Sequence, residues 1–218
     1  LCFIFFIQFP TDAQPPQTLS PDLQRITEPA STLDWLRLQP GTEMTTPEFI
    51  AQYKTPLGLS ADYDFVLLRS ETDQLGWTHH RYQLYYKGVP VEWAQYIFHE
   101  KDGYLRKANG HLVPGLDLAV TSALPETLAL QIAMNHIGGE VWAWEDSTHE
   151  ALLRDIENDP QATFYPTGEL VIVAPNFDRK VSDYRLAWKF DVFAVAPMAR
   201  AYVYVDALDG SVVFEESR

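Results

Sequence analysis

The sequence predicts an α+β protein made of two similar modules, in each of which one helix packs across a face of an antiparallel sheet. In both halves of the chain, a helical spacing of apolar residues is followed by strands in which apolar and polar residues alternate. In both halves a strand also leads to an Asp-Gly pair, at 102–103 and at 209–210, and this pair is typical of a tight hairpin turn. Asp-Gly turns are common, so chance is the alternative explanation of this repetition.

The composition limits the classes of protein to which the chain can belong. Its 218 residues are 46% hydrophobic and 13% aromatic, which is enough for one large core or two small ones. The formal net charge of −14 argues against phosphate-rich partners, because nucleic acids and anionic membranes are bound by clustered Lys and Arg. The single cysteine, Cys2, excludes an internal disulfide. We therefore expect a folded acidic chain that binds no nucleic acid.

Residues 1–13 are predicted to be part of a signal peptide. Their initial apolar run is too short to span a bilayer, which takes about 20 residues, but it fits the end of a signal-peptide hydrophobic region. Thr11 and Ala13 occupy the small-residue positions of a cleavage site before Gln14. We therefore expect secretion, with no membrane association after this segment is removed. A buried N-terminal strand is the alternative.

Residues 14–45 are rich in Pro, Thr and Ser and show little periodicity, which predicts an extended leader. The first module, residues 46–113, begins with a predicted helix. Thr46 can cap this helix, Pro47 suits its first turn, and Glu48 favours the positive end of its dipole.

Period-two alternation follows the first helix. In the stretch 82–86, Tyr82, Leu84 and Tyr86 are expected on one face of a strand. Gln83 and Tyr85 are expected on the other face. The expected strands lie at 63–69, from Gly76 to 86, at 91–99 and at 104–108, with turns at 87–90, 102–103 and 109–110.

A linker, residues 114–123, precedes the second module, residues 124–218. This module begins with a helix from Pro125 to His136, which two glycines end. Ser147 and Glu150 have the spacing of a capping box, which predicts a second helix there. The expected strands lie at 169–174, 184–195, 200–206 and 211–215.

No combination of residues in the sequence predicts catalysis or metal binding. A zinc peptidase helix needs His-Glu-x-x-His, and the two His-Glu pairs, at His99 and His149, lack the second histidine. The adjacent His79 and His80 face opposite sides of a strand, so they cannot chelate one ion together. Trp142 and Trp144 share a face and can hold a ligand, although packing in a core or an interface is favoured. We therefore expect no catalytic and no metal-ligating residue.

The stretch from Gly76 to Gly103 resembles the fungalysin/thermolysin propeptide domain, whose pattern is Gly-x-x-His-x-Arg-x-Gln, then Gly-Val-Pro-Val, then a strand ending in His and an Asp-Gly turn. Residues 124–218 resemble a PepSY domain, and the two resemblances together imply two cystatin-like modules. The residues that match the propeptide motif are Gly76, His79, Arg81, Gln83, Gly88, Val89, Pro90, Val91, His99, Asp102 and Gly103.

The resemblance implies a non-catalytic N-terminal propeptide of a secreted thermolysin-like zinc metalloprotease. Such a segment assists the folding of the catalytic domain and inhibits it in cis, and that domain would follow Arg218. Zinc and calcium are then expected only in the catalytic domain, and no cofactor in this segment. The alternative is a stand-alone secreted binding module that inhibits or escorts proteases in trans. A third interpretation, that the chain is itself an enzyme, lacks supporting residues.

The expected contacts with the protease lie in two places. The first comprises the sheet faces and turns around Gly88, Val89 and Pro90, and for these three residues a plain hairpin turn is the alternative. The second is the C-terminal segment from Phe214 to Arg218, because residues joined to the catalytic domain must lie near it.

Overall fold

The computed structural model describes residues 18–176 and 180–218. The predicted signal peptide and its cleavage site lie outside these residues. The N-terminal half, residues 18–113, contains α1 (Pro21–Ile26), β1 (Trp35–Arg37), α2 (Thr46–Tyr53), β2 (Tyr63–Thr72), β3 (Trp77–Tyr86), β4 (Val89–Lys101) and β5 (Tyr104–Gly110). The C-terminal half contains α3 (Glu126–Ile137), β6 (Val141–Trp142), the 3-10 helix η1 (Ala143–Glu145), α4 (Ser147–Glu157), β7 (Glu169–Val173), the 3-10 helix η2 (Val181–Asp183), β8 (Arg185–Ala196), β9 (Ala199–Asp206) and β10 (Val212–Ser217).

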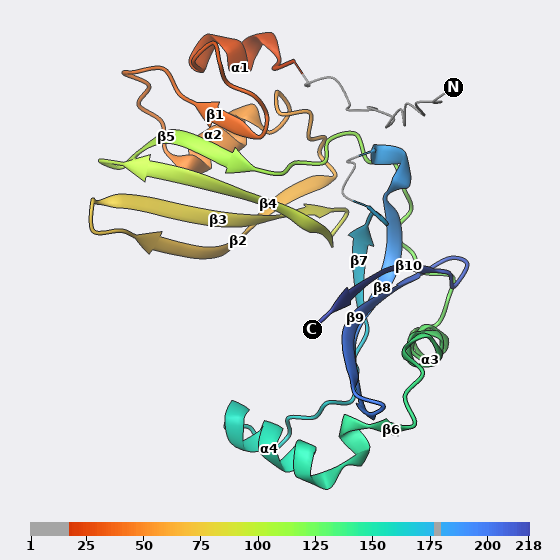
Figure 1. The fold of residues 1–218 in the computed structure, drawn as a ribbon. Helices are drawn as coiled ribbons and strands as arrows, with labels where there is room; N and C mark the ends of the chain where they lie inside the picture. Colours follow the sequence, from red (N-terminus) through yellow and green to blue (C-terminus); the bar gives the residue numbers. More distant parts are fainter. Residues whose placement is uncertain (1–17, 177–179) are drawn as a thin grey trace, which may run out of the picture.

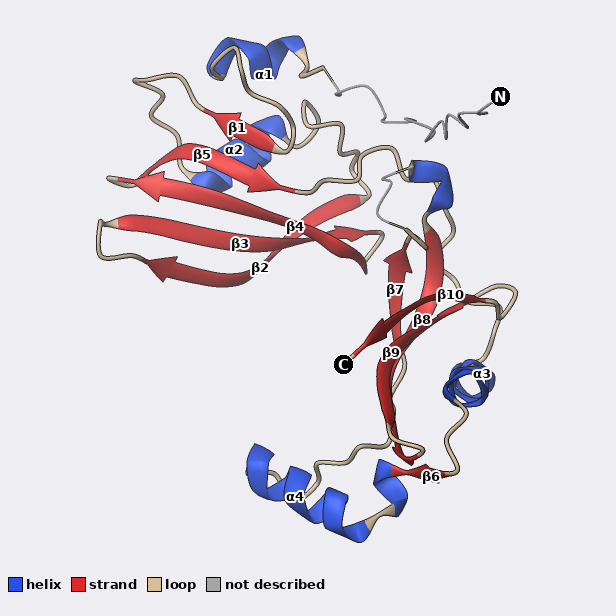
Figure 2. Ribbon diagram, viewed as in Figure 1, coloured by secondary structure: helices blue, strands red, loops and turns tan. Residues whose placement is uncertain are grey.

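Within residues 18–176 and 180–218, the strands form one continuous sheet of ten strands, with the order β1-β5-β4-β7-β8-β9-β10 (Figures 1 and 2). β3 and β2 extend from β4, and β6 pairs with β8. Every pairing is antiparallel except that of β4 with β7, which is parallel and joins the two halves at Val91 and Ile172. The predicted α+β class is therefore confirmed. Its division into two cystatin-like modules stays a prediction, because the two halves share one sheet.

In the N-terminal half, α2 packs on the sheet through aromatic rings. Phe49 of α2 lies 5.9 Å from the ring of Phe98, and Phe98 also contacts Phe65 and Tyr82 edge-to-face. Such edge-to-face pairs add to the stabilisation that burial of the rings already provides. The N-cap of α2 is Thr45, which forms a capping box with Glu48, so the predicted cap one residue later is wrong.

The predicted extended leader is wrong for the part that the structure describes. Residues 18–45 contain α1 and β1, and β1 adds an antiparallel strand to β5. Leu23 of α1 and Leu36 of β1 are completely buried in the core of the N-terminal half. The leucines are too widely spaced among polar residues for a periodicity test, but burial of each still contributes about 1.5–3 kcal/mol, which holds the segment on the sheet.

In the C-terminal half, α3 lies across the sheet and packs on it through its small residues. Ala129 and Ala133 are fully buried and pack with Phe190 and Val192 of β8, and Gly138 ends the helix in the left-handed conformation, as predicted. The predicted capping box of α4 is wrong. Asp146 is the N-cap and accepts from the backbone of residues 148 and 149, because a carboxylate here satisfies two free N–H groups at once.

The carboxylate of Glu150 has a different role from the predicted one. It accepts hydrogen bonds from the backbone N–H of Phe164 and the hydroxyl of Thr163, and it pairs with Arg154. Glu150 therefore fastens α4 to the loop that leads into β7. α4 lies at the far end of the C-terminal half, away from the N-terminal sheet (Figure 1).

The predicted linker 114–123 is tied to both halves. The hydroxyl of Tyr63 donates to the carbonyl of Val113 and accepts from the N–H of Leu116, and burial raises the pKa of this phenol to about 12. The backbone N–H groups of Ala123 and Leu124 both donate to the carbonyl of Ala207. These bonds fix the connection at each end.

The predicted turn at Asn109 and Gly110 is wrong, because both residues lie in β5 and pair with β4. Gly110 has φ +147° and approaches β4 so closely that a Cβ would lie 2.2 Å from the carbonyl oxygen of Gln95. Glycine is required here for close strand contact rather than for a turn.

Replacement of Gly110 by alanine therefore tests the register of β4 and β5. We expect G110A to lower the free energy of unfolding by about 1–3 kcal/mol more than G115A, because only G110A also overpacks the sheet. Gly115 has φ +83° with nothing within 4 Å of its Cβ position, so it is the matched control. Urea denaturation measures both. Equal losses would contradict the close approach.

Candidate functional site

Four polar residues of the propeptide motif lie together on one face of the N-terminal sheet. His79, Arg81 and Gln83 alternate along β3, and His99 is the cross-strand partner of His79 on β4. The core, with Phe98 and α2, lies on the other face. We call this side of β1 to β5 the outward face. It is partly exposed to solvent, so these motif residues are available for more than packing.

His79 and His99 are joined by a hydrogen bond between their Nδ1 atoms, 2.6 Å apart. His99 Nε2 also bonds to the amide oxygen of Asn109 at 2.6 Å, and His79 Nε2 lies 3.4 Å from a carboxylate oxygen of Asp73. Because an amide oxygen only accepts, His99 carries its proton on Nε2 and its bare Nδ1 accepts from His79. The four side chains form a chain of polar contacts across the sheet.

The surroundings of these four side chains determine which of them carry protons. Burial lowers the pKa of His99, although the bond to Asn109 opposes this effect. The pKa of Asp73 is also lowered, first because its carboxylate accepts from the backbone N–H of Trp77. The lowered pKa favours neutral His99, whose bare Nδ1 accepts from His79.

Arg81 and Gln83, both in β3, form hydrogen bonds to neighbouring groups of β4. Arg81 donates to the amide oxygen of Gln95 at 3.0 Å. The amide nitrogen of Gln83 lies within 3.2 Å of the carbonyls of Val91 and Ala94, where the register of β3 and β4 shifts. Gln83 thus supplies hydrogen bonds that the regular ladder lacks at this bulge.

The remaining motif residues form turns and the joint between the halves. Gly76 and Gly88 lie in the two hairpin turns that flank β3, with φ +75° and +80°. Asp102 and Gly103 both have positive φ and connect β4 to β5, as the Asp-Gly signal predicted. Val89, Pro90 and Val91 are in β4, and Val91 is completely buried where β4 meets β7.

The segment after Val91 binds the C-terminal half, which the sequence analysis missed. Glu92 accepts from Lys189 at 2.8 Å, and the side chains of both are mostly buried. Trp93 has φ +57°, a conformation uncommon for a large side chain, and its ring contacts those of Tyr204 and Phe214. This conformation results from a bulge in β4, and no local sequence pattern predicts a bulge at this position.

The two predicted contact regions occupy different places. Gly88 is at an exposed hairpin tip, whereas Phe214 packs in the joint between the halves. Arg218 pairs with Asp191, and its guanidinium lies 4.7 Å from the centre of the Tyr202 ring. The structure therefore groups Phe214 with the joint and leaves Gly88 apart.

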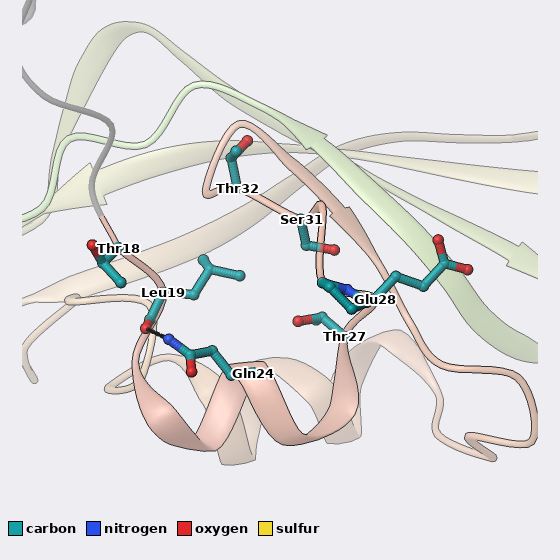
Figure 3. A pocket seen from close by; sticks show the side chains of 8 residues that line it. Thr18, Leu19, Gln24, Thr27, Glu28, Ser31 and Thr32 are labelled. Atoms are coloured by element: carbon teal, nitrogen blue, oxygen red, sulfur yellow. Dashed lines mark hydrogen bonds between the residues drawn. The ribbon is translucent and has the colours of Figure 1, made fainter.

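A cavity of about 470 Å³ lies beside α1 (Figure 3). Its polar groups are bound to the local backbone: Gln24 donates to the carbonyl of Leu19, and Thr27 donates to that of Leu23. Within the described ranges, no cluster of three His, Cys, Asp or Glu side chains is arranged to hold a metal ion. No helix among those residues has the length and apolarity to cross a membrane.

Residues 63–112 match the sequence model of the family described as the Fungalysin/Thermolysin Propeptide Motif. The matched stretch runs from β2 to just beyond β5 and includes all the motif residues named above. The resemblance to a thermolysin-like protease propeptide region is therefore confirmed.

Relatives among characterised proteins extend over more of the chain. Thermolysin of Alicyclobacillus acidocaldarius subsp. acidocaldarius is 29% identical over 161 residues, which cover 72% of this chain and 26% of that protein. The thermostable neutral protease NprT of Geobacillus stearothermophilus is 27% identical over 180 residues, which cover 79% of this chain and 30% of that protein. The chain thus spans less than a third of the length of these relatives.

Among solved structures, the C-terminal domain of Bacillus megaterium YpeB superposes with a TM-score of 0.35 and 9% identity, covering 84% of this chain and 70% of that domain.

The buried pair at the joint gives a stability prediction. In E92Q, Lys189 keeps its charge but loses its carboxylate partner, so we expect a loss of about 2 kcal/mol in the free energy of unfolding. The control is D22N, which breaks an exposed pair with Arg25 and should cost no more than about 0.5 kcal/mol. Denaturant titration of both variants measures the difference. Equal effects would show that Glu92 does not fasten the joint.

The His99 pKa predicts acid sensitivity. Because folding lowers this pKa below 6.5, the unfolded chain takes up the proton first, and stability is lost as the pH falls below about 6.5. We expect wild type to lose more stability between pH 7.5 and pH 5.5 than H99Q does. Carboxylates whose pKa is lowered are common to both proteins and cancel in the comparison. Equal losses in the two proteins would refute the assignment.

Proposed function

We propose that this chain is the propeptide of a secreted thermolysin-like metalloprotease, acting as intramolecular chaperone and inhibitor of a catalytic domain that follows Arg218. The family match at residues 63–112 and the thermolysin relatives support this proposal. In it, the rest of the relatives' length corresponds to the protease domain, which holds the zinc and calcium. Residues 1–13 serve as the signal peptide, and residues 124–218 are the PepSY-like part.

One observation carries the proposal: the family-matched strands and the C-terminal strand belong to the same sheet. Val91 pairs with Ile172 of β7, and Trp93 contacts Phe214 of β10. A domain attached after Arg218 would therefore meet a surface that already has a fixed orientation. Preorganisation of this kind reduces the entropy lost on docking.

Attachment in cis also makes weak complementarity sufficient. A tethered partner has an effective concentration on the order of 1 mM, and a Kd of about 1 μM would then leave roughly one molecule in a thousand open. Inhibition before cleavage therefore needs no deep pocket for a protease side chain. Release after cleavage follows from the loss of the tether.

Burial excludes some of the predicted contact residues from direct contact with the protease. Val89 is only 9% exposed and lies in the core, so Gly88 and Pro90 are left as the accessible part of that turn. Phe214 supports the joint, and Arg218 lies at the end of β10. We propose that the hairpin tip and the end of β10 contact the protease.

The test begins with the reading frame beyond Arg218, where we expect a domain that contains His-Glu-x-x-His. That domain is then produced separately and refolded with and without this 218-residue chain. We expect a higher yield of active protease when the chain is present during refolding, and inhibition at micromolar concentrations when it is added afterwards.

The outcomes separate the proposed role from its alternatives. A frame without a protease domain would exclude the role in cis and leave a stand-alone binding module. A protease domain that refolds equally well alone and is not inhibited at tens of micromolar would refute both the chaperone role and the inhibitor role.

A further inference from the structure

The outward face of the N-terminal sheet is positively charged, although the whole chain has a formal net charge of −14. Cross-strand register places these side chains on one side, opposite to the core. Its basic residues are Arg37 of β1, Arg69 of β2, Arg81 of β3, Lys101 of β4 and Lys107 of β5, around His79 and His99. They outnumber the carboxylates of the same face, which include Asp64 and Glu71 of β2, and Asp73, which contacts His79.

Two pairs of like charges stand directly opposite each other on this face. Arg69 of β2 is the register partner of Arg81 of β3, and Arg37 of β1 is the register partner of Lys107 of β5. Like charges in directly opposite positions destabilise a sheet, because their side chains start only about 5 Å apart. The fold therefore keeps an unfavourable arrangement twice on the same surface.

Contacts within the chain compensate these charges only in part. Arg69 lies 3.2 Å from Glu71, but both side chains are more than half exposed, so the pair contributes little. Arg81 is bound to the neutral amide of Gln95. One cavity of about 300 Å³ lies between these side chains and is large enough for one further acidic side chain. It is lined by Arg69, Glu71, His79, Arg81, Ile97 and His99.

The aromatic rings beside this surface argue against a nucleic acid as its partner. Lys107 lies over Trp77 at 4.9 Å, and Arg37 lies over Trp35 at 5.9 Å, so cations of the chain itself already occupy a face of each ring. Base stacking needs open ring faces.

We propose that the outward face docks an acidic surface of the protease domain, with one carboxylate of that surface inserted between Arg69 and Arg81. A carboxylate there would accept charge-assisted hydrogen bonds from both guanidinium groups and remove the repulsion between them. The chemistry of the partner follows from charge complementarity: discrete carboxylates spaced over a flat patch. This inference rests on the proposed function, and it adds the outward face to the hairpin tip and the end of β10 as a surface that contacts the protease.

The test compares two double charge reversals in the full chain. R37E/R69E changes one member of each like-charge pair, and R25E/K180E reverses two basic residues outside the outward face. The probe is the separately produced protease domain encoded after Arg218. We expect R37E/R69E to slow association by about tenfold at low salt, with the difference shrinking at high salt, because surface charges act mainly on the association rate. The control should associate like wild type.

The other measurements distinguish failure of the proposed function from failure of the docking inference. Thermal unfolding of both variants checks that they fold. If wild type itself does not bind the protease domain, the proposed function fails. If wild type binds and R37E/R69E binds equally fast at low salt, the docking inference fails while the function stands. Charge reversal that abolishes only self-association of the chain, or only binding to heparin or single-stranded DNA, would also overturn the inference by assigning the face to another occupant.

Discussion

The architecture depends on the start of β4, where one strand enters two packing environments. Val91 pairs with Ile172 of the C-terminal half, and two residues later the chain bulges so that Trp93 adopts a positive φ. Beyond the bulge, Tyr96 and Phe98 return to the core under α2. Strain of order 1–3 kcal/mol at such a residue persists only when the surroundings outweigh it. Here, the buried Glu92–Lys189 pair and the ring contacts of Trp93 provide that compensation.

Local signals predicted the elements that local chemistry determines. The Asp102-Gly103 turn forms because glycine accepts positive φ, and α3 ends at Gly138 for the same reason. The leader could not be predicted in this way, because Leu36 becomes part of a strand only through its pairing with β5. Asn109-Gly110 has the composition of a turn, yet a distant strand decides its conformation.

The candidate site was predictable only to the level of its residue types. Alternation along β3 correctly separated His79 from His80, which pairs with Glu100 on the other face. The contact of His79 with His99 requires the register of β4, which the sequence of the 19 intervening residues does not specify on its own. In the same way, the net charge of −14 describes the chain as a whole, whereas a sheet sorts individual charges onto faces according to register. A bulk property therefore concealed a basic surface.

The short strand β1 also has a consequence for the solubility of the protein. Its three residues cover the edge of β5, where unpaired N–H and C=O groups would otherwise be open to another chain. At the opposite edge, β2 exposes Leu67 and Leu68, and the bulge between Leu67 and Arg69 interrupts the regular ladder there. One edge is thus covered and the other is irregular, and both devices oppose edge-to-edge aggregation. Recombinant versions trimmed at residue 46 would lose the first of these protections and would leave the edge of β5 open to pairing with another chain.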